Sequence, residues 1–243
     1  MQIDEQKLVE TVKRLLAKGK GILAADESNS TADKRLESFG IATGEEMRKK
    51  FRHLFLCAPG IEAYLSGVIL YDETFWSENC EGAQFRTALA DCGILPGIKV
   101  DTGAKDMPGF PDEKLTVGLD DLAERAKKYF DAGAKFTKWR AVIKIDAEKN
   151  LPTTECITAN AEALARYARI VQEIGLVPII EPEVLLDGKH DLKTSEKITT
   201  IVVSTIFEKL AEAKAYLPGL ILKTSMVING NQNTDESSPA EVA

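Results

Sequence analysis

Short apolar runs with β-strand character alternate with longer helical patterns along this chain of 243 residues. The strand-like runs cover residues 20–26, 67–71, 96–101, 135–143, 177–184 and 219–227. The helical patterns around them cover residues 4–18, 29–38, 45–57, 83–92, 119–134, 153–175 and 192–217. Strands that alternate with helices predict parallel βαβ units with right-handed crossovers, because each helix returns the chain to the start of the next strand.

Chain length and the absence of a nucleotide-binding motif favour one fold within the α/β class. No glycine-rich phosphate motif follows the first strand, which disfavours a dinucleotide-binding fold. A chain of 243 residues is ordinary for a single (βα) barrel domain. A closed barrel has eight strands, whereas only six strand-like runs are present here. We therefore predict an incomplete TIM (βα)8 barrel, formed as one domain over residues 1–243 and lacking its last two strands.

Five of the six strand-like runs carry charged residues inside or at the end of apolar sequence. Burying a charge is costly unless it is paired, neutralised or used chemically, so this repetition indicates a function. Residues two apart share one face of a strand, which places Lys138 beside Arg140 and Glu181 beside Glu183. Barrel enzymes build their active sites at the carboxyl ends of the strands. We expect one charged site there, made of Asp26, Lys99, Lys138, Arg140, Glu181, Glu183 and Lys223.

The run Gly219–Val227 holds a single lysine, Lys223, in its middle. A lysine that is desolvated beside other cations loses its proton more easily and becomes an amine nucleophile, as Schiff-base chemistry requires. The alternative is a lysine at the end of a strand whose ammonium stays in solvent, because periodicity does not measure burial. The other charged strands favour the nucleophile.

Charge and composition exclude several classes of partner. With a net charge of −7, the chain lacks the basic face that nucleic-acid binding needs, whereas the strand cations suit a small anion such as a sugar phosphate. Four cysteines without a C-x-x-C pair or a secretory signal indicate reduced thiols and a cytoplasmic protein. His53 and His190 lie in separate segments, so we expect no zinc site and no metal. No apolar run reaches the about 18 residues of a membrane span.

Five motifs, in this order along the chain, resemble class I fructose-bisphosphate aldolase, the metal-independent Schiff-base family. They are Gly19–Ser28, Gly97–Asp101, Lys138–Arg140, Glu181–Glu183 and Leu222–Lys223. The resemblance covers residues 5–243, and the ordered set is far more specific than any single motif. It implies an eight-stranded (βα) barrel, no cofactor, and reversible cleavage of fructose 1,6-bisphosphate to dihydroxyacetone phosphate and glyceraldehyde 3-phosphate.

The resemblance also implies roles by matched position. Lys223 resembles the lysine that forms the Schiff base, with Lys138 beside it, and Glu181 resembles the acid/base that dehydrates the carbinolamine. The neighbouring carboxylate of Glu183 is expected to raise one of the two pKa values. Asp26 resembles the group that accepts the C4 hydroxyl proton. The residues that resemble substrate-binding groups are Lys99, Arg140, Ser28, Thr31, Lys34 and Arg35.

Two features leave alternatives open. Ser28 and Thr31 lie at a helix start, which is an anion site, but such residues also serve as plain N-caps. The polar segment after Asn229 ends as a helix begins at Ser238, which suggests truncation, the alternative being a frayed C-terminus. The family's last strands, ketone-side phosphate site and terminal tyrosine have no counterpart here. We therefore expect little activity, free edges on the first and sixth strands, and aggregation or oligomerisation.

Two other functions stay open at the level of sequence. Another Schiff-base lyase on the same barrel, such as a transaldolase or a deoxyribose-phosphate aldolase, also places a lysine on a strand, although Glu181–Glu183 and Lys138–Arg140 favour the bisphosphate enzyme. A truncated, inactive scaffold that binds other proteins is the second. The family is typically dimeric or tetrameric, so we expect a homo-oligomer at full length that binds a sugar phosphate and neither nucleic acid nor membrane.

Overall fold

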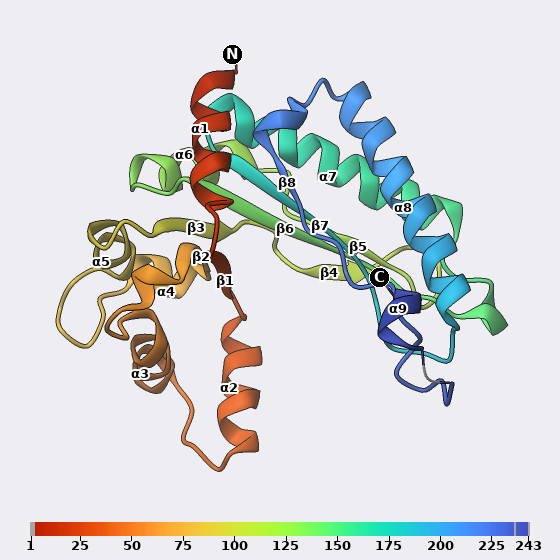
Figure 1. Cartoon of the computed structure of the whole chain (residues 1–243), viewed down its shortest axis with the longest axis horizontal. Helices are drawn as coiled ribbons and strands as arrows, with labels where there is room; N and C mark the ends of the chain where they lie inside the picture. The colour runs from red at the N-terminus through yellow and green to blue at the C-terminus, as the bar shows by residue number, and fades with distance from the viewer. Residues whose placement is uncertain (1–2, 236, 243) are drawn as a thin grey trace.

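The computed structural model describes residues 3–235 and 237–242, in which a curved parallel sheet has helices on its outer side (Figure 1). Six strands of these residues pair in parallel in the order β1-β2-β3-β6-β7-β8, so that β1 and β8 form the edges. Their bounds are β1 Gly21–Ala25, β2 Leu65–Leu70, β3 Leu95–Lys99, β6 Phe136–Ile143, β7 Val177–Val184 and β8 Ile221–Leu222. The predicted incomplete (βα)8 barrel with six parallel strands is confirmed.

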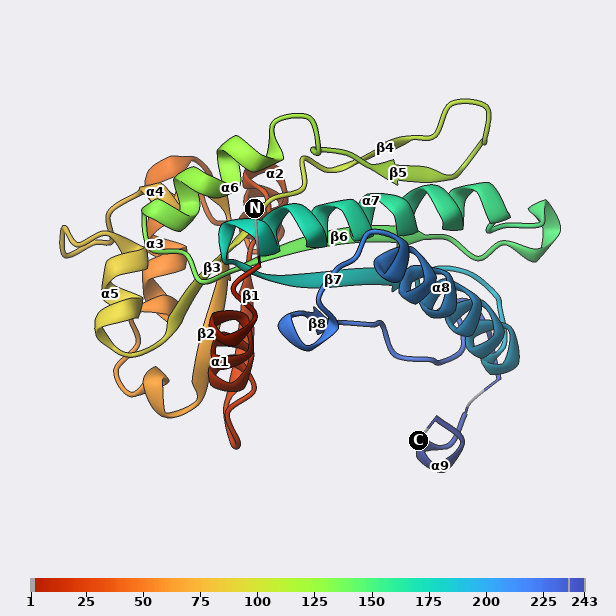
Figure 2. The ribbon, with the colours of Figure 1, turned by 90° about the horizontal axis from the view of Figure 1, so that it is seen from above.

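Most helices connect consecutive strands and cover the outer face of the sheet, whereas the first helix precedes β1 and the last follows β8. The helices are α1 Glu5–Leu15, α2 Asn29–Ser38, α3 Glu45–Leu56, α4 Asp72–Trp76, α5 Phe85–Asp91, α6 Leu122–Asp131, α7 Thr154–Ile174, α8 Leu192–Glu212 and α9 Pro239–Val242. The long helices α7 and α8 pack on each other and on β6 and β7 (Figure 2). The Thr153 hydroxyl accepts the Cys156 amide proton where α7 begins, and Gly175 ends the helix at a φ of 97° that favours glycine.

The outer core lies between the sheet and these helices. Trp139 and Ile180 point outward from β6 and β7 and are fully buried there, as is Tyr167 of α7. The Trp139 and Tyr167 rings stack at 5.4 Å, and the Tyr167 hydroxyl lies 2.7 Å from the Thr137 hydroxyl. Because alternate residues of a strand face opposite ways, the neighbours of these apolar residues face the inside of the curve.

At the amino end of the strands, α1 closes the inner face. Leu8 and Leu15 of α1 pack against Phe136 and Ile179, which point inward from β6 and β7. Gly97 of β3 leaves room for the Phe136 ring, since a Cβ at position 97 would lie 2.3 Å from a ring carbon. Two positions further along β6 and β7, on the same face, stand the charged residues Lys138 and Glu181. The apolar contacts of Phe136 and Ile179 therefore lie directly beneath these charges.

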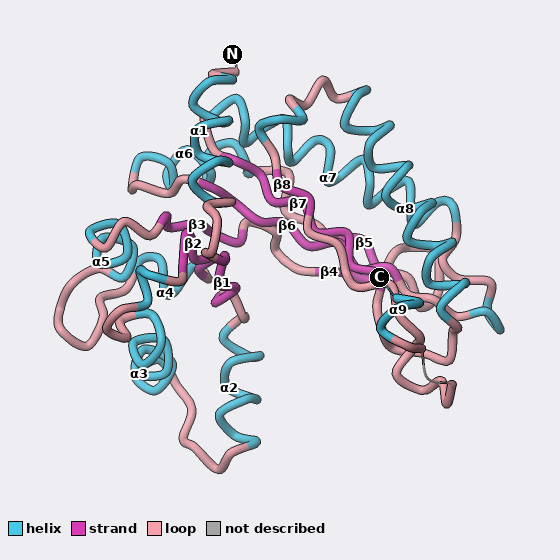
Figure 3. The backbone as a smooth tube through the Cα atoms, in the orientation of Figure 1, coloured by secondary structure: helices cyan, strands magenta, loops and turns pink. Residues whose placement is uncertain are grey.

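The structure corrects four predicted elements. The short helix α4 was not predicted, and the expected loop 102–118 contains an antiparallel hairpin of β4 Ala104–Asp106 and β5 Lys114–Thr116. Helix α8 ends at Glu212 instead of 217, before a 3-10 turn at Leu217–Gly219. The strand expected at 219–227 is reduced to the two residues of β8, and the chain then continues as a loop (Figure 3).

The helix start expected at Ser238 is present as α9. The Glu241 amide donates to the Ser238 hydroxyl oxygen at 3.3 Å, and the Ser238 amide and hydroxyl donate back to the Glu241 carboxylate. This reciprocal pair is a capping box. Across the described ranges, no helix is both long and apolar enough to cross a membrane.

Candidate active site

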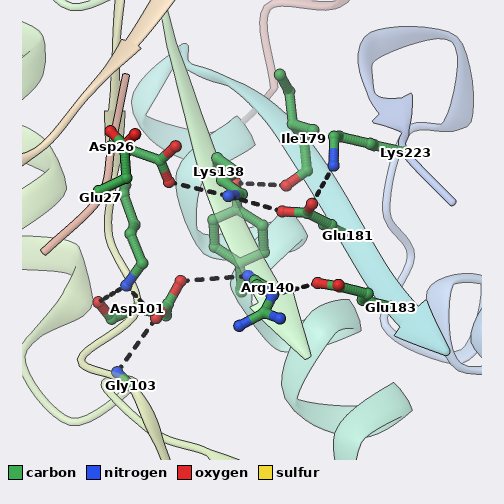
Figure 4. Close-up of polar contacts among 12 residues, drawn as sticks. Asp26, Glu27, Asp101, Gly103, Lys138, Arg140, Ile179, Glu181, Glu183 and Lys223 are labelled. Atoms are coloured by element: carbon green, nitrogen blue, oxygen red, sulfur yellow. Dashed lines mark hydrogen bonds and ion pairs between the residues drawn. The ribbon is translucent and has the colours of Figure 1, made fainter. Parts of the chain in front are cut away.

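Two rows of alternating charge cross the inner face of the sheet (Figure 4). The deep chain consists of Asp26, Lys138, Glu181 and Lys223, and the rim chain consists of Lys99, Asp101, Arg140 and Glu183. Arg140 and Glu183 of the rim chain stand two residues after Lys138 and Glu181 of the deep chain. Asp101 likewise stands two residues after Lys99. Strand periodicity therefore puts both rows on one face, at successive depths.

The deep chain is a continuous series of ion pairs from β1 to β8. The Lys138 Nζ lies 2.9 Å from the Asp26 Oδ2 and 2.7 Å from the Glu181 Oε2. The other oxygen of Glu181, Oε1, accepts a hydrogen bond from the Lys223 ammonium. Glu181 thus bridges two lysines that are far apart in sequence, and the two lysines contact different oxygens of one carboxylate.

Burial and pairing act in opposite directions on the deep chain. Less than a tenth of each side chain of Asp26, Lys138 and Glu181 is exposed. Burial lowers the pKa of Lys138, but the carboxylates of Asp26 and Glu181 outweigh it, and the pKa is raised above its ordinary value. Burial likewise raises the pKa of Glu181, but the two ammonium groups outweigh it, and the pKa is lowered.

This lowered pKa contradicts one expectation from the sequence. Glu181 and Glu183 were expected to interact as two carboxylates, which would raise one pKa. In the structure each carboxylate is paired with a cation instead, Glu181 with Lys138 and Lys223, and Glu183 with Arg140. In the free protein Glu181 is therefore an anion held between two cations.

The rim chain lies nearer to solvent. The Lys99 ammonium donates to the Asp101 Oδ1, and the Asp101 Oδ2 accepts the Arg140 backbone amide at 3.2 Å. The Arg140 guanidinium donates to the Glu183 carboxylate, and this hydrogen bond, more than the partial burial that opposes it, raises the pKa of Arg140. Both side chains of that last pair stay roughly one-third exposed, at 41% and 31%. Arg140 is therefore accessible to an anion.

Lys223 differs from its expected setting. It was predicted in the middle of a buried strand, whereas it follows the two-residue edge strand β8 and its side chain is 49% exposed. Its backbone amide donates to the Ile180 carbonyl at 2.9 Å, and the Ser225 hydroxyl accepts the Val184 amide at 3.1 Å. Backbone and hydroxyl bonds to β7 thus hold the segment on either side of this lysine.

A second set of contacts fixes the chain beyond Lys223. The latch, defined as residues 230–233 against residues 186–190, contains three backbone hydrogen bonds of 2.8–2.9 Å that join the Gly230, Asn231 and Gln232 amides to that loop. The Asn231 side chain donates to Asp187 at 3.1 Å and accepts the Gly188 amide at 3.3 Å. Gly230 is needed here, because a Cβ would lie 2.3 Å from the Gly188 carbonyl oxygen.

The predicted anion-binding end lies at the start of α2. The Ser28 hydroxyl accepts the Thr31 amide at 3.4 Å and lies 3.0 Å from the Thr31 hydroxyl, so N-capping does occur. Arg35 is paired with Glu27. Lys34 is exposed, and within the described residues no ion pair involves it. Ser28 and Lys99 line one cavity of about 670 Å³, which links this helix start to the rim chain.

Sequence reasoning overlooked two residues that organise the site. Asp101 joins Lys99 to Arg140, and its position two residues after Lys99 was the available signal. Glu27 binds Arg35 and also the buried Arg52 of α3, whose guanidinium donates to the Glu27 carbonyl at 3.0 Å. The two contacts between Glu27 and Arg52 have no local sequence signature, because these residues lie 25 positions apart.

The carboxylates of the site are each paired with a lysine or arginine side chain. In the ranges 3–235 and 237–242, no group of three or more histidine, cysteine, aspartate and glutamate side chains is arranged to hold a metal ion. The His190 imidazole is buried outside both chains, and burial lowers its pKa. The chemistry that these residues offer is therefore that of an amine beside carboxylates.

Comparisons with known proteins agree with this geometry. A family model described as fructose-bisphosphate aldolase class-I matches residues 7–243. The probable fructose-bisphosphate aldolase class 1 of Xanthomonas campestris is 47% identical over 238 residues, which are 98% of this chain and 71% of that protein. The fructose-bisphosphate aldolase of Dictyostelium discoideum is 46% identical over 224 residues, 92% of this chain and 63% of that protein.

A solved structure gives the same result. Fructose-bisphosphate aldolase from Plasmodium falciparum, in complex with TRAP and a small-molecule inhibitor, matches with a TM-score of 0.96 and 42% identity, over 98% of this chain and 69% of that chain. Fold and site together define a parallel α/β barrel protein with a lysine and carboxylates on its inner face. The chain belongs to the class I fructose-bisphosphate aldolase family, which removes the other barrel lyases as alternatives.

Proposed function

We propose that Lys223 is the amine that condenses with the ketone of a sugar phosphate in the reversible aldol cleavage of fructose 1,6-bisphosphate. The observation that supports this role is the contact between the Lys223 ammonium and the Glu181 carboxylate, at the end of the deep chain. An ammonium must lose its proton before it attacks a carbonyl, and a carboxylate in contact with it accepts that proton. The half-exposed side chain leaves the amine accessible to a substrate.

Glu181 changes role as charge around it changes. Its lowered pKa belongs to the free protein, in which two ammonium groups face it. In the neutral carbinolamine the charge on Lys223 is gone, so Glu181 retains one cationic neighbour, Lys138, and its burial favours the protonated form. A protonated Glu181 then donates its proton to the departing hydroxyl, which produces the iminium that stabilises the carbanion after the C3–C4 bond breaks.

The remaining charged residues act on the substrate. Asp26, held by Lys138, accepts the C4 hydroxyl proton, and Glu183 positions Arg140. Lys99 and Arg140 bind the anionic substrate along the rim chain. The α2 start binds the distal phosphate through Ser28, Thr31, Lys34 and Arg35, where the Ser28 cap and the exposed Lys34 support an anion site.

Borohydride trapping tests this assignment directly. We expect dihydroxyacetone phosphate and borohydride to add one stable adduct to the chain, located by peptide mapping on Lys223. Lys223→Met should abolish the adduct, whereas Lys127→Met, which removes an exposed lysine paired with Asp131, should leave it unchanged. An adduct on Lys138 or Lys99 in the unmodified chain would contradict the role of Lys223.

The setting of the protein is also part of the proposal. Residues 1–243 act as one (βα) barrel domain, in the cytoplasm, as a homo-oligomer that binds a sugar phosphate and neither nucleic acid nor membrane. The acidic net charge of −7 and the exposed apolar side chains Phe39, Leu54 and Tyr64 support this. Light scattering coupled to size-exclusion chromatography should give a mass at least twice that of the chain, and a monomer would contradict the oligomer.

A further inference from the structure

Two cysteines that are far apart in sequence face one cavity on the outer side of the sheet. Cys57 follows the last residue of α3, and Cys92 follows the last residue of α5. Both line a cavity of about 400 Å³ whose other walls include Leu56, Leu89 and Ile94. This cavity shares no residue with the deep chain or the rim chain. It is therefore a separate thiol site.

A third thiol, Cys80, lies close by but outside the cavity. It is exposed, and it is absent from the described residues that line the cavity. Its loop is held by Asn79, whose Oδ1 accepts the Glu81 and Ala83 amides at 2.8 and 3.1 Å. The Asn79 Nδ2 in turn lies 3.6 Å from the Cys57 sulfur. The asparagine thus stands between the loop of Cys80 and the thiol of Cys57.

Exposure separates the two cavity thiols. Cys92 is exposed, whereas Cys57 is partly buried, and burial raises the pKa of the Cys57 thiol despite the hydrogen bond from Asn79. The thiolate is the form that reacts with oxidants, and access to solvent favours reaction. Of the two cavity thiols, Cys92 is therefore the one that an oxidant reaches first, and Cys57 is the second.

We propose that Cys57 and Cys92 form a reversible disulfide across this cavity when the chain meets a hydroperoxide. In the first step the Cys92 thiolate attacks the hydroperoxide, a sulfur–oxygen bond forms, the oxygen–oxygen bond breaks, and an alkoxide or hydroxide leaves. In the second step Cys57 attacks the sulfur of the Cys92 sulfenic acid, the sulfur–sulfur bond forms, and water leaves. Two thiols are oxidised and one hydroperoxide is reduced, and a small dithiol reverses the reaction.

The bridge would constrain a substantial part of the fold. The segment between the two cysteines contains β2, α4 and α5, and Cys92 stands three residues before β3. A disulfide restricts the unfolded chain, which stabilises the folded state when the native geometry accepts the bond. We expect the oxidised chain to melt about 5–10 °C above the reduced chain.

Non-reducing peptide mapping after treatment of the reduced chain with hydrogen peroxide tests the proposal. A linked Cys57–Cys92 peptide should form in the unmodified chain and in Cys80→Ser, and disappear in Cys57→Ser and in Cys92→Ser. Cys57→Ser should instead accumulate sulfenic acid at Cys92, detected with dimedone. The rise in melting temperature should follow the linked peptide and vanish with dithiothreitol.

Three results would overturn the proposal. They are a Cys57–Cys80 link, oxidation of Cys92 to sulfinic acid in the unmodified chain without any bridge, and dimers linked through Cys92 as the only disulfide. The buried Cys156, whose pKa is raised to about 12 mainly by burial, should stay reduced in every variant and serves as the internal reference. None of these readouts depends on the aldol chemistry of Lys223.

Discussion

The deep chain and the rim chain contain the same alternation of lysine or arginine with carboxylates, but they differ in their contact with water. Lys138 and Arg140 stand two residues apart on β6 and point to the same side. The Lys138 side chain is 7% exposed and binds two carboxylates, whereas the Arg140 side chain is 41% exposed and binds one. One step along a strand thus separates a charge that is fixed inside the protein from one that is open to a ligand.

This difference in exposure indicates different roles for the two chains. A buried ion pair is held in place because breaking it leaves an uncompensated charge, whereas an exposed pair is screened and rearranges at little cost. Lys223 combines both settings, because its half-exposed amine touches the buried Glu181. We infer that the deep chain orients the proton-transfer groups and that the rim chain exchanges its internal partners for the substrate.

The largest effect should come from cutting the deep chain at its centre. Lys138→Met leaves Asp26 and Glu181 buried without a shared cation, and we expect the free energy of unfolding to fall by about 3–5 kcal/mol. Urea denaturation at neutral pH measures this loss. Partial recovery is expected in Lys138→Met/Glu181→Gln, because the second substitution removes one of the uncompensated charges, and a lack of coupling between the two changes would contradict the buried chain.

The pH dependence of the free energy of unfolding should also reveal the ion pairs of the deep chain, because acidification protonates Glu181. The pKa of Glu181 is lowered by folding, so its contribution is complete above the unfolded value of about 4.3 and is lost as the pH falls through the lower folded value. The pKa of Lys138 is raised, so its contribution is complete below its unfolded value and is lost as the pH rises through the folded value. Urea midpoints of Glu181→Gln should therefore decline less on acidification than those of Glu183→Gln, and equal slopes would contradict this.

Much of this arrangement could be predicted from the sequence, because charges two residues apart in apolar runs reveal a shared face of a strand. The pairs Lys138/Arg140 and Glu181/Glu183 were placed together on this basis, and the structure brings them together. Partner choice could not be predicted in the same way. The register between β6 and β7 aligns Arg140 with Glu181, yet Glu181 binds Lys138 and Glu183 binds Arg140, so each ion pair is diagonal to the register.

The errors come from long-range contacts or from elements too short to show a period. The extent of β8 depends on its pairing with β7, which involves Ile221 and Leu222. The prediction rested on apolar composition, so the predicted strand was too long. Helix α4 has five residues, too few for a helical period to be recognised. Cys57 and Cys92 line one cavity because the fold brings the ends of α3 and α5 to it, and no spacing in the sequence indicates this.

A smaller effect is expected where the latch holds the segment after Lys223. Asn231→Ala removes one hydrogen bond to Asp187 and one from the Gly188 amide, and we expect a loss of about 1–2 kcal/mol in the free energy of unfolding. Amide hydrogen exchange should accelerate in residues 224–230 and stay unchanged in β6. Asn229→Ala is the matched control, because its side chain donates to the Asp235 carbonyl outside the latch. Equal acceleration in both variants would show that the latch does not position this segment.

The smallest effect on stability should come from the rim chain. Arg140→Met removes the exposed pair with Glu183, and the free energy of unfolding should fall by about 1 kcal/mol or less, since solvent already screens this pair. Arg140 and Lys138 are cations on one strand and one face, so the two methionine variants compare burial at matched positions. If Arg140 exchanges Glu183 for an anionic substrate, the concentration of dihydroxyacetone phosphate that half-saturates borohydride trapping should rise while the trapping rate at saturation stays near that of the unmodified chain. A loss of stability as large as that of Lys138→Met would contradict the division between the two chains, because it would mean that a charge with 41% exposure is held as tightly as one with 7%.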